Sequence, residues 1–437
     1  MYLPKYVEDC IFRLENAGFA AYAVGGCVRD VCLGLPPQDY DLCTSALPEQ
    51  TIALFSDHPL VLNGLKHGTI GVVTKGNVVE ITTFRTEGDY LDNRHPQWIS
   101  FVPTVEEDLA RRDFTVNAMA WSPVRGFADP FGGREDLERR VLRAVGDPQL
   151  RFREDSLRIL RGVRFAVRFS LTPERETEEA MIELSHLMDN LARERVFSEL
   201  CKLLPLISAG ELLRFAPILG AVIPELKPGF GFDQRSDHHA YQLFEHTARV
   251  VENVPGDLAL RWAALLHDVA KPACFFLDDA GQGHFYGHDR ESARMADDIL
   301  RRLRAPTALR EEVVTLIANH MVPLEADRKF LRRRLSRFGP ETLEKLLALQ
   351  IADTDATGVH SGTERFAGVA RMIARLREED ACLTVRDLAI SGHDLLALGF
   401  SGPAIGALQK QLLEQVLEET LPNTREALLS AAQEQKT

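Results

Sequence analysis

Hydrophobic and polar residues follow two different periods along the chain, and the change falls near residue 145. Before it, short apolar runs typical of strands lie at 21–26, 69–84 and 98–102, with Gly76-Asn77 as the expected hairpin turn of the second. After it, apolar residues recur at the spacing of a helix, beginning with Leu157, Leu160, Val163 and Val167. The pattern predicts an α+β domain followed by helical segments.

The chain is longer than a single hydrophobic core usually supports, so several domains are expected in its 437 residues. The Gly-rich, polar segment at 227–239 is a plausible linker between two helical blocks. We therefore expect four domains, at residues 1–145, 146–230, 236–360 and 361–437. The last contains two amphipathic helices around a Ser-Gly-Pro turn.

Composition narrows the classes of protein to consider. No run approaches the roughly 20 apolar residues that span a bilayer, so no membrane association is expected. The first residues lack the basic and apolar regions of a signal peptide. Seven cysteines are scattered without Cys-x-x-Cys spacing, which favours a reducing cytoplasm.

The net charge of −13 argues against bulk electrostatic attraction to nucleic acid. Two arginine-rich stretches stand out against it. One holds Arg151, Arg153, Arg158, Arg161, Arg164 and Arg168, and the other holds Arg328, Lys329, Arg332, Arg333, Arg334 and Arg337. Each is either a solvated helix face or a local phosphate-binding surface.

The densest group of chemically informative residues follows the first apolar run. Gly25 and Gly26 lack a Cβ, which allows phosphates to approach the backbone, and Arg29 is placed to meet one. Asp39 and Asp41 are two residues apart, so on a strand both carboxylates face one side and can hold Mg²⁺. Either fragment alone is more typical of a turn or a strand end, but together they indicate a nucleotidyltransferase site.

A third acid and a second polar group extend this site. Glu80 lies on an otherwise apolar strand, although an exposed position on a two-faced strand is the plainer interpretation. Arg111 and Arg112 would clamp a triphosphate, and Asp113 and Asn117 would contact ribose or orient an arginine. The alternative for this segment is the start of a surface helix.

Another acid–arginine group follows in the helical region. Glu154, Asp155 and Arg158 are expected within one turn of helix, with Arg161 and Arg164 on the same side. This is either a salt-bridged helix or a rigid donor and acceptor pattern that matches the edge of a pyrimidine or of adenine.

Histidines and aspartates form a further group, most of them in helical contexts. Its members are His246, His267, Asp268, His288, His320 and Asp353. A lone buried histidine is usually a hydrogen-bonded core residue. As a set, imidazoles and carboxylates are suitable ligands for a divalent transition metal.

Over about its first 205 residues the chain resembles the class II tRNA nucleotidyltransferases, which are the CCA-adding enzymes and the related bacterial poly(A) polymerases. The likeness is carried by GGCVRD with DYD, RRDFTVNA, DPFGG, REDSLRILRGVRF and RERVFSEL, in the family's order. It implies that Asp39 and Asp41 bind the catalytic Mg²⁺ ions, with Glu80 as the third acid. Two-metal activation of the tRNA 3′-hydroxyl would follow.

The same resemblance implies roles for the other residues. Triphosphate and ribose contacts would come from Gly25, Gly26, Arg29, Arg111, Arg112, Asp113 and Asn117. Asp155 and Arg158 would be the amino-acid template for incoming CTP or ATP, with Glu154 and Arg161 holding them. Arg164 would also line this nucleotide site, and the helix of Arg195 and Glu199 would brace it.

Residues 240–355 resemble the HD phosphohydrolase superfamily through the order His, His-Asp, His, His, Asp. The likeness implies one metal on His246, His267, Asp268 and Asp353, with His288 and His320 available to a second. The implied fold is α+β and multidomain: a polymerase-β-like mixed-sheet head, then all-α neck, body, HD and tail domains. The segment after about 385 resembles the tRNA-binding tail.

The leading hypothesis is addition of CCA to tRNA. The chain keeps a flexible segment with Asp92 and Arg94 that CC-adding relatives lack, which favours full CCA addition. Poly(A) synthesis and A-only or CC-only addition share the same motifs and stay open. A hypothesis of another class is a metal-dependent phosphohydrolase or nucleotide-binding regulator.

Overall fold

The computed structural model describes residues 1–88, 99–236, 240–358, 364–379 and 382–435. The chain forms two compact units. Unit 1 comprises Met1–Ile207 and Arg214–Pro224, and unit 2 comprises Ser208–Leu213 and Glu225–Thr437. The expected four-domain division is finer than this and stays a prediction.

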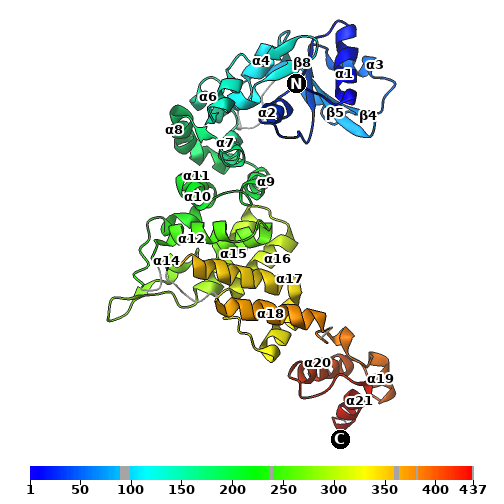
Figure 1. Ribbon diagram of the computed structural model, residues 1–437, viewed down its shortest axis with the longest axis vertical. Coiled ribbons are helices and arrows are strands. Elements are labelled where there is room, and N and C mark those ends of the chain that lie inside the picture. The colour runs from blue at the N-terminus through cyan, green and yellow to red at the C-terminus, as the bar shows by residue number, and fades with distance from the viewer. Residues whose placement is uncertain (89–98, 237–239, 359–363, 380–381, 436–437) are drawn as a thin grey trace. The chain divides into compact units, whose positions relative to one another are not determined.

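A seven-stranded mixed sheet forms the first half of unit 1, where the strand pattern predicts an α+β domain and the resemblance implies a mixed sheet (Figure 1). Its strands are β1 (Ala21–Val24), β2 (Asp41–Thr44), β3 (Leu60–Val61), β4 (Thr69–Thr74), β5 (Asn77–Thr83), β8 (Ala120–Ser122) and β9 (Gly126–Ala128), in the order β3-β4-β5-β2-β1-β8-β9. β2 and β5 run parallel, and the other neighbours run antiparallel. The β4–β5 turn lies at Lys75-Gly76, one residue earlier than expected, with φ values of 47° and 79°.

Helices also occur among the strands of the sheet, and from Pro148 onward unit 1 is mainly helical. The remaining elements of unit 1 are α1 (Lys5–Asn16), α2 (Gly26–Cys32), α3 (Pro48–Leu54), η1 (Leu65–His67), β6 (Arg85–Glu87), β7 (Ile99–Phe101), α4 (Val105–Ala110), η2 (Thr115–Asn117), α5 (Gly133–Glu138), β10 (Val141–Leu142), α6 (Pro148–Glu154), α7 (Leu157–Phe169), β11 (Thr172–Pro173), α8 (Arg175–Glu183), η3 (Leu184–Asn190), α9 (Arg193–Leu203) and α11 (Ala216–Val222). α4 packs on the sheet through Val105 and Leu109, which join a buried cluster with Cys43 of β2. α7 is buried along most of its length, and Gly162 allows Phe114 to pack closely on it, since a Cβ there would lie 2.9 Å from the ring.

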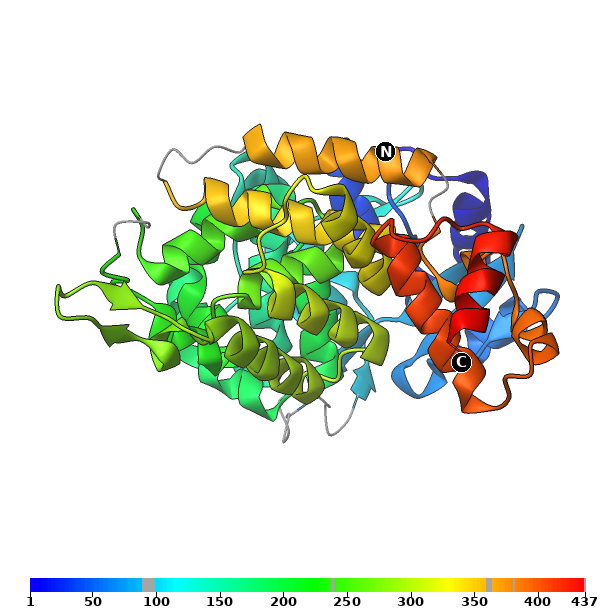
Figure 2. The same cartoon turned by 90° about the horizontal axis from the view of Figure 1, so that it is seen from below.

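Unit 2 is mainly helical, as expected. Its elements are η4 (Pro224–Gly229), α12 (Leu243–Asn253), α13 (Leu258–Leu266), α14 (Lys271–Cys274), β12 (Phe276–Leu277), β13 (Gly283–His284), α15 (His288–Arg302), α16 (Thr307–Asn319), α17 (Arg328–Asp355), α18 (Glu364–Glu378), η5 (Val385–Asp387), α19 (Gly392–Ala397), α20 (Pro403–Leu417) and α21 (Arg425–Glu434), while α10 (Ala209–Arg214) lies at the division between the units. The short hairpin β12–β13 interrupts the expected all-α block (Figure 2). α17 is kinked at Gly339 and Pro340.

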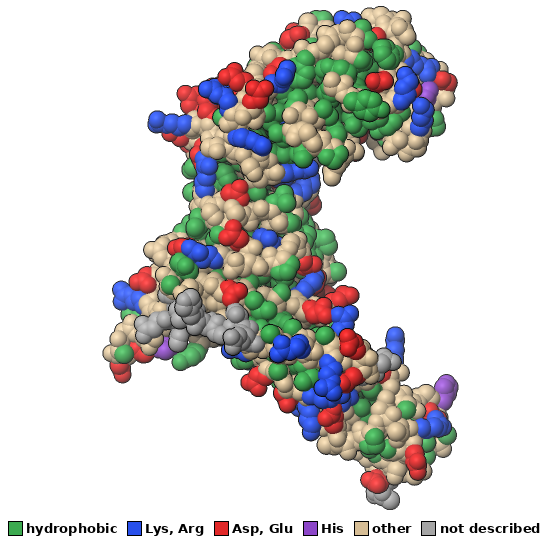
Figure 3. All heavy atoms as spheres, in the orientation of Figure 1, with side chains coloured by type: hydrophobic (Ala, Val, Ile, Leu, Met, Phe, Trp, Pro, Cys, Tyr) green, Lys and Arg blue, Asp and Glu red, His purple; other side chains and the backbone are tan. Residues whose placement is uncertain are grey.

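The second arginine-rich stretch, on α17, is partly paired with acids. Arg328 pairs with Glu379 and Glu419, each at 2.7 Å, and Arg333 pairs with Glu418. On the face shown in Figure 3, basic and acidic side chains are interspersed. The pairs account for Arg328, Arg332 and Arg333, and both interpretations of the stretch stay open. Across the described residues, no helix is both long enough and apolar enough to span a membrane.

Candidate functional sites

The first site begins at the turn between β1 and α2. Gly25 has a φ of +75°, and a Cβ added there would lie 2.7 Å from Nη1 of Arg112. A side chain at this position would therefore strain the backbone and displace the arginine. Gly25 and Gly26 both line a cleft of about 540 Å³.

Three carboxylates gather at the edge of the sheet beside this cleft. Asp41 and Glu80 are directly paired residues of the parallel strands β2 and β5, so their side chains leave the same face of the sheet. Asp39 lies before β2 rather than on it, because the strand begins at Asp41. The expected alternation along one strand is therefore wrong, although both aspartates are exposed.

The environment of Asp41 favours a cation. Desolvation in the cleft raises the pKa of this carboxyl, and the charges of Glu80 and Asp39 raise it further, against the lowering effect of Arg112. A divalent ion would relieve the repulsion between these acids, and carboxylate oxygens suit Mg²⁺. The donor set therefore fits the ion that the sequence implies.

Arginines dominate the lining of the cleft. Those that line it are Arg29, Arg111, Arg112, Arg158, Arg161, Arg164, Arg168 and Arg195, against the acids Asp41, Asp113 and Asp155. Most of the first arginine-rich stretch thus faces this cavity. An excess of guanidinium groups suits a polyanion such as a triphosphate.

Buried acids hold these arginines in place. Asp113 binds Arg161 through its Oδ2, which accepts from Nε at 2.8 Å, and accepts from Nδ2 of Asn117 through its Oδ1 at 3.0 Å. Asn117 in turn accepts from Arg29 at 2.5 Å. Burial would raise the pKa of Asp113, but Arg161 and Asn117 outweigh it and lower the pKa to about 2. Of the two roles expected for Asp113 and Asn117, orienting arginines is the one these contacts support.

Asp108, which the sequence analysis did not single out, binds Arg111 and Arg112. Its Oδ1 accepts from Nη2 of Arg111 at 2.8 Å, and its Oδ2 accepts from Nη2 of Arg112 at 3.3 Å. Asp108 is fully buried, and despite that burial the two arginines lower its pKa. Arg111 and Arg112 follow Asp108 by three and four residues at the end of α4, and this helical spacing could have indicated the ion pairs. Asp92 and Arg94 lie outside the described residues.

Glu154, Asp155 and Arg158 do not share one helix turn as expected. α6 ends at Glu154 and α7 begins at Leu157, so Asp155 lies in the extended break between them, with φ −140° and ψ 102°. Oε2 of Glu154 accepts from Nη1 of Arg158 at 2.6 Å, as the expected role of Glu154 requires. The break lets Asp155 turn into the cleft instead of along the helix.

Helix α9 contacts the residues of the cleft through two side chains one turn apart, Arg195 and Glu199. Nη2 of Arg195 donates to Oδ2 of Asp155 at 2.8 Å, and the family resemblance had implied that the helix of Arg195 braces this site. Oε2 of Glu199 accepts from Nε of Arg164 at 2.6 Å, and both side chains are less than a tenth exposed. Arg161 binds Asp113 at 2.7 Å, and its expected role in holding Asp155 and Arg158 stays a prediction.

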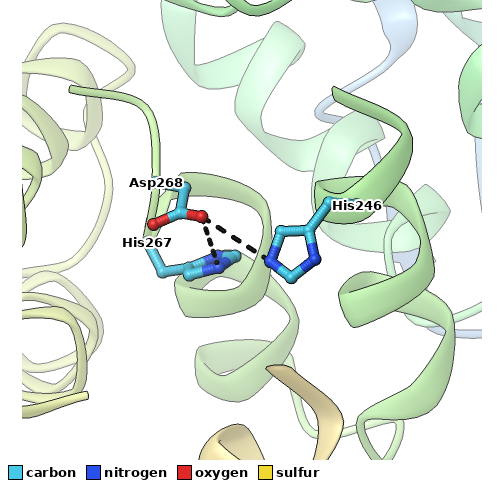
Figure 4. A group of neighbouring side chains, drawn as sticks. All are labelled: His246, His267 and Asp268. Atoms are coloured by element: carbon cyan, nitrogen blue, oxygen red, sulfur yellow. Dashed lines mark ion pairs between the residues drawn. The ribbon is translucent and has the colours of Figure 1, made fainter. Parts of the chain in front are cut away.

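The second site lies in unit 2, where all six expected residues come together. Asp268 is central: its Oδ2 lies 3.3 Å from Nε2 of His267 and 3.6 Å from Nε2 of His246 (Figure 4). Its Oδ1 lies 3.2 Å from Nε2 of His288 and 3.9 Å from Nε2 of His320. Asp353 approaches Nε2 of His246 at 2.9 Å.

Backbone carbonyls fix the orientation of all four imidazoles. Nδ1 of each ring lies 2.6–3.1 Å from a carbonyl oxygen, those of Ala356, Ala264, Phe285 and Ile317 for His246, His267, His288 and His320. A carbonyl can only accept, so Nδ1 donates and Nε2 points at Asp268. Within the described residues, Nε2 of His267, His288 and His320 makes no hydrogen bond. Buried nitrogens aimed at shared carboxylates fit a metal centre.

Two groups of three residues can each hold an ion: His246, His267 and Asp268, and Asp268, His288 and His320. Without an ion, burial and the neighbouring charges of the cluster shift the pKa values of His267 and His320. Burial would lower the pKa of His267, but Asp268 and Asp353 outweigh it and raise the pKa to about 10. Burial together with the charge of His267 lowers the pKa of His320 to about 4.

Lys271 is a neighbour of this cluster that the sequence reasoning missed. Its Nζ lies 2.7 Å from Oδ2 of Asp268 and donates to Oε1 of Gln234 at 3.1 Å. Asp268, Lys271, His288 and Asp353 line a cavity of about 520 Å³. The spacing of Lys271, three residues after Asp268, was the signal. The cluster can hold divalent cations beside an ammonium group and an accessible cavity.

Comparisons with known proteins cover both units. Residues 21–143 match the family model "Poly A polymerase head domain", residues 170–228 match "Probable RNA and SrmB-binding site of polymerase A", and residues 289–432 match a model for tRNA nucleotidyltransferase domain 2. The chain is 32% identical over 455 residues to a CCA-adding enzyme of Streptococcus mutans, covering 98% of this chain and 97% of that enzyme. It is 35% identical over 424 residues to an A-adding tRNA nucleotidyltransferase of Deinococcus radiodurans, covering 90% of this chain and 91% of that enzyme.

Other relatives match over less of their length. A CCA-adding enzyme of Geobacillus stearothermophilus is 47% identical over 206 residues, which is 46% of this chain and half of that enzyme. Among solved structures, the Bacillus stearothermophilus CCA-adding enzyme in complex with CTP superposes with a TM-score of 0.73 at 28% identity, covering 100% of this chain and 98% of that one. The expected fold class, a mixed-sheet head followed by helical domains, is confirmed.

Proposed function

This chain belongs to the tRNA nucleotidyltransferase family, and we propose that it completes or repairs the 3′-terminal CCA of tRNA from CTP and ATP. The observation that carries the proposal is the pairing of Asp41 with Glu80 at the edge of a cleft lined by arginines. Carboxylates for a metal and guanidinium groups for a triphosphate lie side by side there. Nucleotidyl transfer needs both.

Different residues of this cleft would bind the metal and the triphosphate. Asp39, Asp41 and Glu80 would hold Mg²⁺, which when bound neutralises charge at the reacting phosphate. Arg29 and Arg161, fixed by Asn117 and Asp113, receive the triphosphate with little reorganisation.

Asp155 and Arg158 supply the choice of base. A carboxylate accepts from the exocyclic amino group of cytosine or adenine, and a guanidinium donates to the neighbouring ring nitrogen. Uracil and guanine present a carbonyl oxygen where the carboxylate requires a donor, so they are rejected. Arg195 and Glu154 keep both groups in position.

Product sequencing tests the proposal. The purified protein is incubated with Mg²⁺, CTP, ATP and a tRNA that lacks its last three nucleotides. Extension by C-C-A and no further supports it. Extension by C-C alone, extension by a long A tail, or no extension would contradict it.

A-only addition is the second candidate, because the Deinococcus radiodurans relative that matches nine tenths of the chain is an A-adding enzyme. Comparing a tRNA that already ends in C-C with the tRNA that lacks all three nucleotides separates the two candidates. Both candidates extend the first by one A, but only a CCA-adding enzyme also extends the tRNA that lacks all three nucleotides.

We further propose that the His/Asp cluster of unit 2 is a metal-dependent phosphohydrolase site. His246, His267, Asp268 and Asp353 would hold one divalent transition metal, and His288 and His320 a second; such a metal lowers the pKa of water. Lys271 is placed to meet a phosphate. Hydrolysis of p-nitrophenyl phosphate by protein supplied with Mn²⁺ or Ni²⁺, and its loss on chelation, tests this.

The division into head (1–145), neck and body (146–230), HD (236–360) and tail (361–437) domains is part of the same proposal. The tail would bind tRNA. A cytoplasmic location agrees with the seven free cysteines, since none of them forms a disulfide.

A further inference from the structure

The hairpin β12–β13 carries aromatic rings on both of its faces. Phe275 and Phe285 pack against Phe232 at centroid distances of 5.2 and 6.5 Å, on the inner side. Phe276 and Tyr286 belong to the other side, because side chains alternate along a strand. Phe276 is 45% exposed and Tyr286 is 76% exposed.

The outer rings form one ordered surface. His284 lies across the hairpin from Phe276, and its ring centroid is 5.3 Å from that of Phe276 and 5.5 Å from that of Tyr286. The planes of His284 and Tyr286 differ by only 15°. Nε2 of His284 lies 2.9 Å from Oδ2 of Asp278, which also accepts hydrogen bonds within the hairpin loop through its Oδ1. The surface is therefore held in place before any ligand arrives.

The same hairpin is tied to the His/Asp cluster. Nζ of Lys271 lies 5.3 Å from the ring centroid of Phe285, and the carbonyl of Phe285 orients His288. Gly283 is packed so closely on Gln234 that a Cβ would lie 2.2 Å from its carbonyl oxygen. Tyr286 and His284 line the cavity of about 520 Å³ that also reaches Asp268 and His288. A ligand with a phosphate at the cluster can therefore place a ring on the hairpin.

We propose that Phe276, His284 and Tyr286 form a base-stacking platform that binds the terminal nucleotide of an RNA strand whose terminal phosphate enters the His/Asp cavity. Aromatic side chains exposed beside a phosphate site are the usual means of holding single-stranded bases. The inference rests on the proposed hydrolase function of this cluster and names its substrate class.

A strand end fits better than a free nucleotide. Sites for small molecules usually enclose most of the ligand, whereas Tyr286 lies at the surface, so a base stacked on it stays open to solvent and the strand can continue. The acidic hairpin loop, with Asp278 and Asp279, would repel following phosphates. The platform is thus suited to the last nucleotide rather than to a long RNA.

The reaction at such an end is a hydrolysis that balances without a further reactant. Water attacks the terminal phosphorus, the bond from phosphorus to the ribose oxygen breaks, and the products are inorganic phosphate and an RNA hydroxyl. The platform itself only binds, so its removal should raise KM and leave kcat nearly unchanged.

The test uses the full chain supplied with Mn²⁺ and two RNA tetranucleotides that end in a 3′-phosphate, one with a normal terminal base and one with an abasic terminal ribose. Tyr286→Ala is expected to raise KM for the first roughly tenfold and to leave KM for the second unchanged. Tyr286→Trp should restore the wild-type value. Leu277→Ala, which removes an exposed apolar residue of the same hairpin, is the matched control and should change neither.

Equal KM values of Tyr286→Ala and wild-type protein for the normal RNA would overturn the proposal. So would hydrolysis of free adenosine 3′-phosphate with no hydrolysis of the RNA. A second readout is independent of turnover: a tetranucleotide with terminal 4-thiouridine is photo-crosslinked to the full chain and the adducts are mapped. Adducts on residues 276–286 support the platform even if no phosphoester is hydrolysed, which would refute the hydrolase function alone. Adducts only elsewhere refute the platform.

Discussion

The two sites use charged side chains in opposite ways. In unit 1 the arginines are fixed by buried acids such as Asp113 and Asp108, while Asp39, Asp41 and Glu80 stay exposed at the edge of the cleft. In unit 2 the four histidines and Asp268 are buried, Asp353 is partly exposed, and backbone carbonyls orient each imidazole of the cluster. The first site combines exposed carboxylates for a metal with fixed arginines for an anion, whereas the second is prepared for cations alone.

This difference predicts how each site acquires its metal. At the first, the negative charge that completes the site arrives with the triphosphate, so the metal should bind together with the nucleotide. At the second, buried nitrogens and carboxylates are already in place, so the metal should remain in the absence of substrate. One chain would then contain an exchangeable and a resident metal site.

Removing an acid from the first site should have the largest effect. Asp41→Ala is expected to lower the rate of nucleotide addition by roughly a thousandfold or more, because the paired position of Glu80 cannot replace its carboxylate. Single-turnover addition of radiolabelled CTP measures it. Asp57→Ala, an exposed aspartate that pairs with Arg13, is the control. Parallel loss of phosphoester hydrolysis would show that the sites are not independent.

The reciprocal change tests the second site. Asp268→Asn should abolish metal-dependent phosphoester hydrolysis, since both candidate ion groups share this carboxylate, and should leave CCA addition unchanged. Both activities are assayed on one preparation. Asp355→Asn removes an exposed aspartate two residues beyond Asp353 and should affect neither. Loss of CCA addition in Asp268→Asn would instead give the cluster a structural role.

Selectivity depends on how rigidly the first cleft is held. Arg195→Ala frees Asp155 from its 2.8 Å contact and should reduce discrimination of CTP and ATP against UTP and GTP by roughly 10- to 100-fold. Ratios of kcat/KM for the four nucleotides measure it. Arg153 is an exposed arginine of the first arginine-rich stretch, and Arg153→Ala should preserve these ratios. Unchanged selectivity in Arg195→Ala would exclude Asp155 as part of the template.

Buried pairing in the first unit should also affect stability. Glu199→Gln leaves Arg164 buried without its partner charge and is expected to cost about 3 kcal/mol of unfolding free energy. Denaturant unfolding measures the change. Glu179→Gln breaks the exposed pair with Arg175 and should leave the midpoint where it is. An equal midpoint for both variants would mean that the brace contributes little.

The smallest effect concerns acid sensitivity. The pKa of Asp113 is lowered in the folded state to about 2 from an ordinary value of 3.8. Its stabilising contribution is therefore full above pH 4 and is lost as the pH falls toward 2. Unfolding profiles of Asp113→Asn should be less acid-dependent than those of the wild type across this range. Identical slopes would contradict the predicted shift.

Local pattern predicted much of both sites. The strands of the head followed from local periodicity, Glu80 from being an acid on an otherwise apolar strand, and the six His/Asp residues of unit 2 from their order along the chain, while the mixed sheet followed from the family resemblance. Such features depend on polar residue types whose burial costs free energy unless they have partners. A buried His-Asp pair, for example, requires partners.

Some side-chain contacts and short strands depend on tertiary packing and could not be predicted from local sequence. The specific contact of Arg195 with Asp155 depends on the packing of α9 on α7 and on the break in the chain at Asp155, neither of which helix periodicity predicts. The hairpin β12–β13 has only two residues in each strand, too few for a period to be recognised. Its aromatic surface therefore emerged only from the structure.

Metal content after gel filtration without added metal or nucleotide tests the contrast between the two sites most directly. We predict that wild-type protein and Asp41→Asn retain bound transition metal, that Asp268→Asn loses it, and that Mg²⁺ is absent from all three until CTP is added. Equal metal content in Asp268→Asn and wild type, or loss in Asp41→Asn, would contradict the account.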